Sequence, residues 1–121
     1  DHMSEIRLGA VESKFADIIW NNEPLRPVEL EKLAEAELNW KRTTTLTILK
    51  RLCERGIFQN KDRIITSLIS REEFYALQSE KFVNDTFEGS LPAFLTAFGS
   101  RKKLSDKEVE ELKKVIDSMR R

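Results

Sequence analysis

The sequence has almost no cysteine or histidine. Cys53 is its one cysteine, so no internal disulfide can form, and His2 is its one histidine. His2 lies in Asp1-His2-Met3, which is typical of a cloning remnant before a native start at Met3. The chain therefore lacks the histidines and cysteines needed for a Cys/His zinc site and for a Ser-His-Asp or Cys-His catalytic site. An acid/base site of carboxylates stays open but offers no distinct pair, and we predict a non-enzyme with no catalytic residue, metal or cofactor.

Long hydrophobic runs are missing as well. No stretch is apolar enough to cross a membrane or to form the core of a signal peptide, so no membrane insertion is expected. Four glycines and three prolines in 121 residues exclude collagen-like and low-complexity chains. A single cysteine fits a reducing compartment, and we predict a cytoplasmic protein of one small domain with an oligomerisation arm.

The formal net charge of +0 conceals an uneven distribution. Residues 12–37 carry seven acidic and three basic side chains, a net charge of −4, whereas residues 41–63 carry seven basic and two acidic ones, a net charge of +5. A basic stretch beside an acidic one is the pattern expected of polyanion binding. A merely solvated helix face would give the same charges.

Apolar residues recur with helical spacing in three segments before residue 57. The first helix should end near residues 21–22, Pro27 suits the first turn of the second, and Gly56 should stop the third. The apolar positions of the three helices are Val11, Phe15, Ile18 and Ile19, then Leu30, Leu33 and Ala34, then Thr45, Ile48, Leu49, Leu52 and Cys53.

A β-hairpin is predicted after the third helix. Two apolar or β-branched runs, residues 57–58 and 64–69, flank a polar segment, although the segment lacks an Asn-Gly turn. Three helices followed by a basic hairpin is the element order of a winged helix-turn-helix. We therefore predict a mainly α fold with a small β-hairpin wing. Residues 1–7 are assigned to a tag remnant and N-terminal arm, and residues 8–69 to a winged-helix DNA-binding domain.

Residues 70–121 are expected to form a helical dimerisation domain. Ser70 and Ser105 each begin a capping-box pattern, and a third helix face follows Gly89. A segment of this size rarely buries enough apolar surface alone, so a second copy is the simplest partner, with packing against its own N-terminal domain as the alternative. The predicted dimerisation residues are Phe74, Leu77, Phe82, Leu91, Phe94, Leu95, Phe98, Val109, Leu112 and Ile116.

The third helix should present its polar side to DNA. Hydroxyl and methyl groups of threonine can contact base edges, and lysine and arginine suit phosphates. Leu46 fits either the edge of the core or a thymine methyl group. The predicted DNA-binding residues are Lys41, Arg42, Thr43, Thr44, Thr47, Lys50, Arg51, Lys61 and Arg63. An ordinary helix with exposed hydroxyls is the competing interpretation of the threonines.

The segment Trp40–Ile57 resembles the W-K-x-S-T-V-x-T-L-L-x-R-L-x-x-K-G-L signature of the penicillinase-repressor family. Residues 12–20 are similar to that family's E-x-x-V-M-x-x-x-W opening, and residues 70–73 to its first helix after the wing. The resemblance covers nearly the whole chain from Leu8.

This resemblance implies a dimeric winged-helix repressor that binds dyad-symmetric operators in double-stranded DNA. Family members control a β-lactamase, an alternative penicillin-binding protein or a copper pump. In the β-lactam branch a membrane sensor-protease signals and the repressor is cut in its C-terminal arm. Thr44 matches the base-contacting threonine of the family, and the cut bond aligns with Ala97-Phe98.

Three departures accompany the resemblance. Leu46 stands where penicillinase repressors carry a base-contacting arginine, and Ala97 replaces the asparagine of the cut bond. The copper branch's Cys-x-Cys pairs are absent, which disfavours copper sensing because Cu(I) needs thiolate ligands. Two other functions remain open: a winged-helix regulator controlled by a small ligand, and a protein-interaction module whose acidic 12–37 face binds a partner protein.

Overall fold

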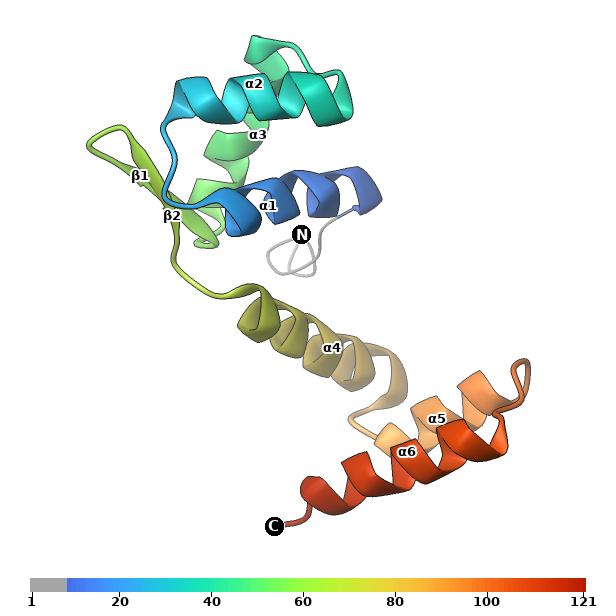
Figure 1. Ribbon diagram of the computed structural model, residues 1–121. Coiled ribbons are helices and arrows are strands. Elements are labelled where there is room, and N and C mark those ends of the chain that lie inside the picture. Colours follow the sequence, from blue (N-terminus) through green and yellow to red (C-terminus); the bar gives the residue numbers. More distant parts are fainter. Residues whose placement is uncertain (1–8) are drawn as a thin grey trace. The chain divides into compact units, whose positions relative to one another are not determined.

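The computed structural model describes residues 9–121, which form six helices and one β-hairpin (Figure 1). It confirms the predicted fold class, a mainly α winged helix. The chain divides into two compact units, one extending to Lys81 and the other starting at Phe82, so that the division falls within the fourth helix. The elements are α1 (Ala10–Asn22), α2 (Pro27–Leu38), α3 (Arg42–Glu54), β1 (Phe58–Lys61), β2 (Ile64–Ser67), α4 (Arg71–Phe87), α5 (Leu91–Gly99) and α6 (Asp106–Ser118).

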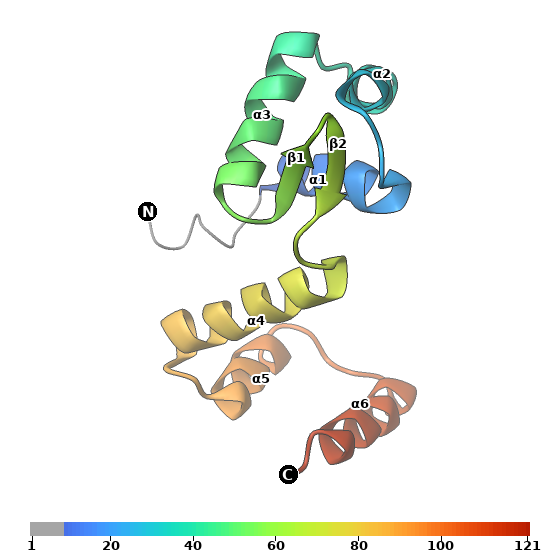
Figure 2. The ribbon, with the colours of Figure 1, turned by 90° about the vertical axis from the view of Figure 1, so that its left-hand side faces the viewer.

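Helices α1 to α3 and the hairpin enclose the core of the first unit. Figure 2 views α2 along its axis, with α3 and the hairpin side by side. Each helix contributes the apolar stripe that its spacing predicts, except that Val11 in the first turn of α1 is half exposed. The buried apolar residues are Phe15, Ala16, Ile18, Ile19, Leu25, Leu30, Ala34, Leu49, Leu52, Ile57, Phe58, Ile65 and Phe74.

The wing is an antiparallel hairpin with Lys61 opposite Ile64. Asp62 and Arg63 form its turn with φ values of 54° and 63°, the conformation of a type I′ turn, without any glycine. Leu25 pairs with Ile65, which lies one residue from the turn-side end of β2. The Glu23 carboxylate accepts hydrogen bonds from the backbone N–H and the hydroxyl of Ser67, at 2.8 and 2.9 Å. The α1–α2 connection thus holds β2 at two points, Ser67 at the base of the wing and Ile65 nearer its turn.

The first turns of α4 belong to the first unit. Phe74 is completely buried and lies 5.8 Å from Trp20 between ring centroids. The Trp20 indole N–H donates to the carbonyl oxygen of Ile69 at 3.1 Å. Arg71 donates to Asp17 at 2.9 Å and to Asn21 at 2.7 Å, and these contacts attach the start of α4 to α1.

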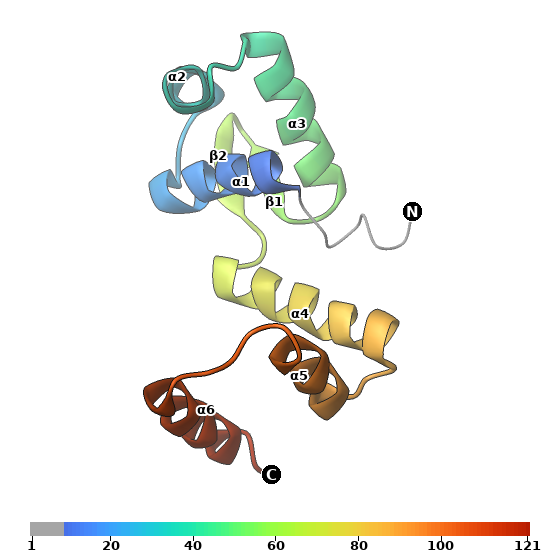
Figure 3. The same ribbon diagram turned by 90° about the vertical axis from the view of Figure 1, so that its right-hand side faces the viewer.

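The second unit contains the end of α4 together with α5 and α6 (Figure 3). Four phenylalanines form a chain of ring contacts from Phe82 and Phe87 to Phe94 and on to Phe98, with centroids 5.6–6.3 Å apart. Ser105 and Glu108 make the predicted reciprocal capping box at the start of α6. Every residue from Phe82 to Arg121 nevertheless keeps some exposed surface, and none is buried.

Candidate nucleic-acid interface

Helix α3 has one buried and one exposed side. Thr45, Leu49 and Leu52 point into the core, whereas Thr43, Thr44 and Thr47 are exposed, as the sequence predicts. No side chain caps the first turn, where Lys41 is the N-cap residue. The free N–H groups of this turn and the neighbouring hydroxyls are donors suited to a phosphate or a base edge.

The basic residues of the 41–63 stretch fall into two classes. Lys41, Lys50, Lys61 and Arg63 are exposed and, within residues 9–121, make no ion pair. The other three are paired with acidic residues of α1 and α2: Arg42 with Glu31 at 3.1 Å, and Arg51 and Arg55 with Glu12 at 3.7 and 3.9 Å. The sequence pattern predicts the positive charge of these arginines but not their internal partners.

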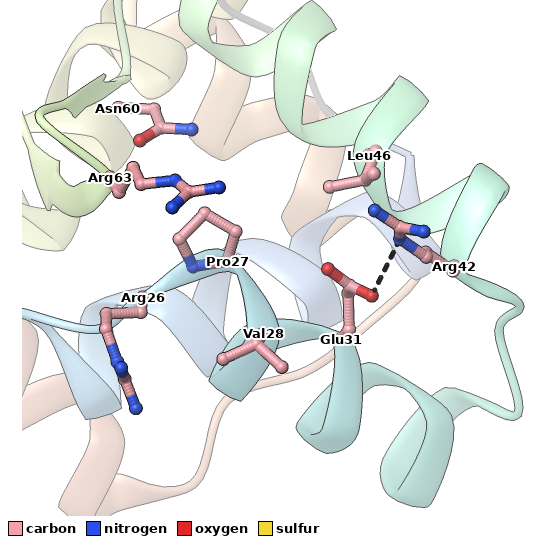
Figure 4. Close-up of a pocket in the computed structure, with 8 residues that line it drawn as sticks. All are labelled: Arg26, Pro27, Val28, Glu31, Arg42, Leu46, Asn60 and Arg63. Atoms are coloured by element: carbon pink, nitrogen blue, oxygen red, sulfur yellow. Dashed lines mark ion pairs between the residues drawn. The ribbon is translucent and has the colours of Figure 1, made fainter.

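The wing turn, the start of α2 and the first half of α3 line a groove of about 580 Å³ (Figure 4). Three arginines, Arg26, Arg42 and Arg63, contribute to it, and Glu31 is its one acidic lining residue within the described chain. Leu46 is half-buried and also lines this groove, so it lies beside the exposed threonines rather than inside the core. Arg26 is not among the predicted DNA-binding residues, because only the fold brings it close to the interface.

Two titratable groups near the interface have shifted pKa values. The backbone N–H of Arg26 donates to Glu29, and this hydrogen bond lowers the pKa of the Glu29 carboxyl. Burial raises the pKa of the Cys53 thiol on α3. A thiol that stays protonated is a poor nucleophile and metal ligand. In the described chain, no cluster of three or more His, Cys, Asp or Glu side chains is arranged to hold a metal.

The predicted dimerisation residues lie in two different environments. Phe74 is wholly enclosed in the core of the first unit, because the first turn of α4 packs on Trp20, and we therefore leave it out of any dimer surface. The other nine are at least partly exposed: Leu77, Phe82, Leu91, Phe94, Leu95, Phe98, Val109, Leu112 and Ile116. Within the second unit, α5 and α6 line an apolar groove of about 360 Å³.

The Ala97-Phe98 bond lies within α5. The Ala97 carbonyl oxygen accepts a hydrogen bond from the Ser100 hydroxyl at 2.7 Å, and 47% of Phe98 is exposed. Access of a protease to this bond therefore requires the end of α5 to unwind. No helix within residues 9–121 combines the length and the apolar character that a membrane crossing requires.

Known proteins that resemble this chain are named as regulatory proteins and repressors. The methicillin resistance regulatory protein MecI of Staphylococcus aureus (strain Mu50 / ATCC 700699) is 25% identical over 114 residues, which cover 91% of this chain and 93% of that protein. The penicillinase repressor of Bacillus licheniformis is 22% identical over 115 residues, covering 92% of this chain and 90% of that protein. A family model described as penicillinase repressor matches residues 8–118. The chain therefore belongs to the penicillinase repressor family, whose members are transcriptional regulators and not enzymes.

Proposed function

We propose that the protein is a homodimeric repressor that binds a dyad-symmetric operator through the exposed side of α3. Thr43, Thr44 and Thr47 contact base edges in the major groove, and the unpaired lysines contact the backbone. The wing, with Lys61 and Arg63, contacts the flanking phosphates. The observation that carries this proposal is that the threonines of α3 and the unpaired cations of α3 and the wing are all exposed, and that Arg63 of the wing lines one groove with the first half of α3.

The dimer surface in this proposal lies on the second unit. The α5–α6 groove and the exposed Phe82, Leu91 and Phe98 leave an apolar surface without cover in the single chain. A second copy of the same segment supplies a matching apolar surface, and a two-fold dimer places two α3 helices on one duplex. We assign residues 8–69 to DNA binding and residues 70–121 to dimerisation, except that Phe74 serves the first core.

We further propose that the regulated gene is of the β-lactam-resistance type, with a sensor-protease pathway that releases the repressor. Cleavage at Ala97-Phe98 would separate α6 from the phenylalanine cluster and so remove one wall of the α5–α6 groove. A chain ending at Ala97 should then sediment as a monomer and bind the operator more weakly. A truncated chain that stays dimeric would exclude this route of release.

Quantitative DNA binding tests the central proposal. The operator is first located by footprinting the upstream region of the protein's own gene, and affinity is then measured against salt concentration. Four unpaired cations per protomer predict a slope of log Kobs against log salt of roughly −4 per protomer, at about −0.9 for each neutralised phosphate.

Two variants separate base contacts from phosphate contacts. Thr44→Ala should lose affinity for the operator but not for random DNA, whereas Lys50→Ala should weaken binding to both about equally. Equal losses on both DNAs for both variants, or a flat salt response of the wild type, would contradict the proposal.

A further inference from the structure

Arg42 is the first residue of α3, and it does not face the solvent alone. Its Nε lies 3.1 Å from Oε1 of Glu31 on α2, and Figure 4 shows this ion pair inside the groove between α2, α3 and the wing. The Glu31 side chain is only 20% exposed, whereas the Arg42 side chain is 75% exposed. The carboxylate is therefore held by the fold, and the arginine is the partner that can move.

Glu31 occupies the place that an anionic ligand of Arg42 would take. The other charged residues lining the groove are Arg26, Arg42 and Arg63, so a nucleic-acid phosphate approaching them also approaches Glu31. A phosphate that takes Arg42 from Glu31 leaves a mostly buried carboxylate without its partner, and like charges then lie close together. The net gain from this arginine is accordingly small.

We propose that Glu31 acts as an internal counter-ion that cancels the contribution of Arg42 to phosphate binding and thereby limits the affinity of the protein for DNA of any sequence. This inference rests on the proposed DNA-binding function and adds an affinity-setting residue to it. Non-specific binding depends on counterion release from phosphates, so a cation that is already neutralised by the protein adds nothing to the salt dependence. In the wild type Arg42 therefore contributes little to phosphate binding, and it contributes fully when Glu31 loses its charge.

Helix α2 supplies a matched control for this effect. Glu35 lies one turn after Glu31 on the same helix, is exposed, and makes no ion pair within the described residues. Glu31→Gln and Glu35→Gln change the net charge by the same amount. A general effect of charge acts on both variants, whereas release of Arg42 acts only on Glu31→Gln.

The experiment measures binding of the full-length chain to a short duplex of random sequence over a range of salt concentrations. Relative to wild type, Glu31→Gln should bind more tightly at low salt and should steepen the slope of log Kobs against log salt by about 0.9 per protomer. Glu35→Gln should change the slope by less than half of that amount. In the double variant Glu31→Gln/Arg42→Gln the steepening should disappear, while Arg42→Gln alone should leave the wild-type slope nearly unchanged.

Three results would overturn the inference while leaving DNA binding intact. These are equal slopes for Glu31→Gln and wild type, equal changes for Glu31→Gln and Glu35→Gln, and steepening that persists without Arg42. Weaker binding by Glu31→Gln would show instead that Glu31 orients Arg42 for its contact. A wild-type chain that binds no duplex at any salt concentration would overturn the proposed function itself. Thermal unfolding of each variant checks that the fold is kept.

Discussion

The seven phenylalanines of the chain differ in burial between its two units. Phe15, Phe58 and Phe74 in the first unit are completely buried, whereas all four in the second unit keep exposed surface, up to 47% for Phe98. The residue type is the same, so the difference comes from the number of elements that surround each ring. Four helices and a hairpin enclose the first core, while the second unit has α5, α6 and only the end of α4.

Size explains this contrast in physical terms. A segment of about 40 residues generally needs a disulfide, a metal or a partner chain to be stable. Among the described residues, the second unit has no cysteine pair and no metal-binding cluster. In the proposed dimer a second copy covers the apolar groove of the second unit, so the two units should respond differently to substitution and to protein concentration.

The largest effect is expected from Phe74→Ala in the first core. Loss of this fully buried ring should lower the free energy of unfolding by about 3–5 kcal/mol, because it removes buried apolar surface and leaves a cavity. Urea unfolding measures the change, and Val11→Ala, at a position that is 50% exposed, should cost about 0.5 kcal/mol or less. Similar losses for the two variants would mean that Phe74 does not belong to the core.

Phe94→Ala should act on association instead. Phe94 contacts the rings of Phe82, Phe87 and Phe98, so its removal disrupts the whole cluster of the second unit. We expect the dimer dissociation constant to rise roughly thirtyfold, which corresponds to about 2 kcal/mol. Sedimentation equilibrium measures this constant. A variant that dissociates like the wild type would remove the difference drawn between the two units.

Thr45→Val should stabilise the first unit. The Thr45 hydroxyl is completely buried and has no hydrogen-bond partner among residues 9–121, and valine has nearly the same shape. The free energy of unfolding should rise by about 1 kcal/mol, because an unsatisfied polar group is removed from the core. Thr47→Val, on the exposed side of α3, serves as the control and should bring no gain. A less stable Thr45→Val chain would show that the hydroxyl is satisfied.

The smallest effect concerns the pH response of the second unit. The hydrogen bond from the backbone N–H of Ser105, together with the nearby Ser105 side chain, lowers the pKa of Glu108 below its ordinary value of 4.5. The unfolded state therefore binds more protons in this range, so the stabilisation is present above pH 4.5 and is lost as pH falls through the lowered pKa. Circular dichroism should show α6 losing helicity there. Glu108→Gln, which keeps the capping hydrogen bond, should lose less helicity as the pH falls below 4.5.

The helices of the first unit could be predicted from sequence because a repeat of apolar residues determines which side of a helix is buried. The same reasoning misplaces Val11, which lies in the first turn of α1 and is half exposed. The hairpin turn is also only weakly signalled in the sequence, because Asp62 and Arg63 adopt the positive φ values of this turn without a glycine.

The ion-pair partners of the interface arginines cannot be predicted from the sequence, for a different reason. Glu31 and Arg42 lie on separate helices, and only the packing of α2 against α3 brings them within 3.1 Å. The exposed positions of Thr43, Thr44 and Thr47, by contrast, follow directly from the apolar stripe on the opposite side of α3. Local periodicity thus predicts which side chains face outward, whereas long-range packing decides which of their charges are already neutralised.

The attachment of α4 to α1 affects how the DNA-binding half can be prepared by itself. Phe74 and Arg71 come after the wing in sequence, yet the ring completes the first core and the guanidinium holds Asp17 and Asn21. A fragment that stops at Ile69, just after the wing, would lack Phe74 and so leave a hole beside Trp20. Expression of the chain as far as Lys81 keeps that hole filled and omits the segment that we propose to dimerise, so this fragment should allow the proposed operator contacts to be measured in a single protomer.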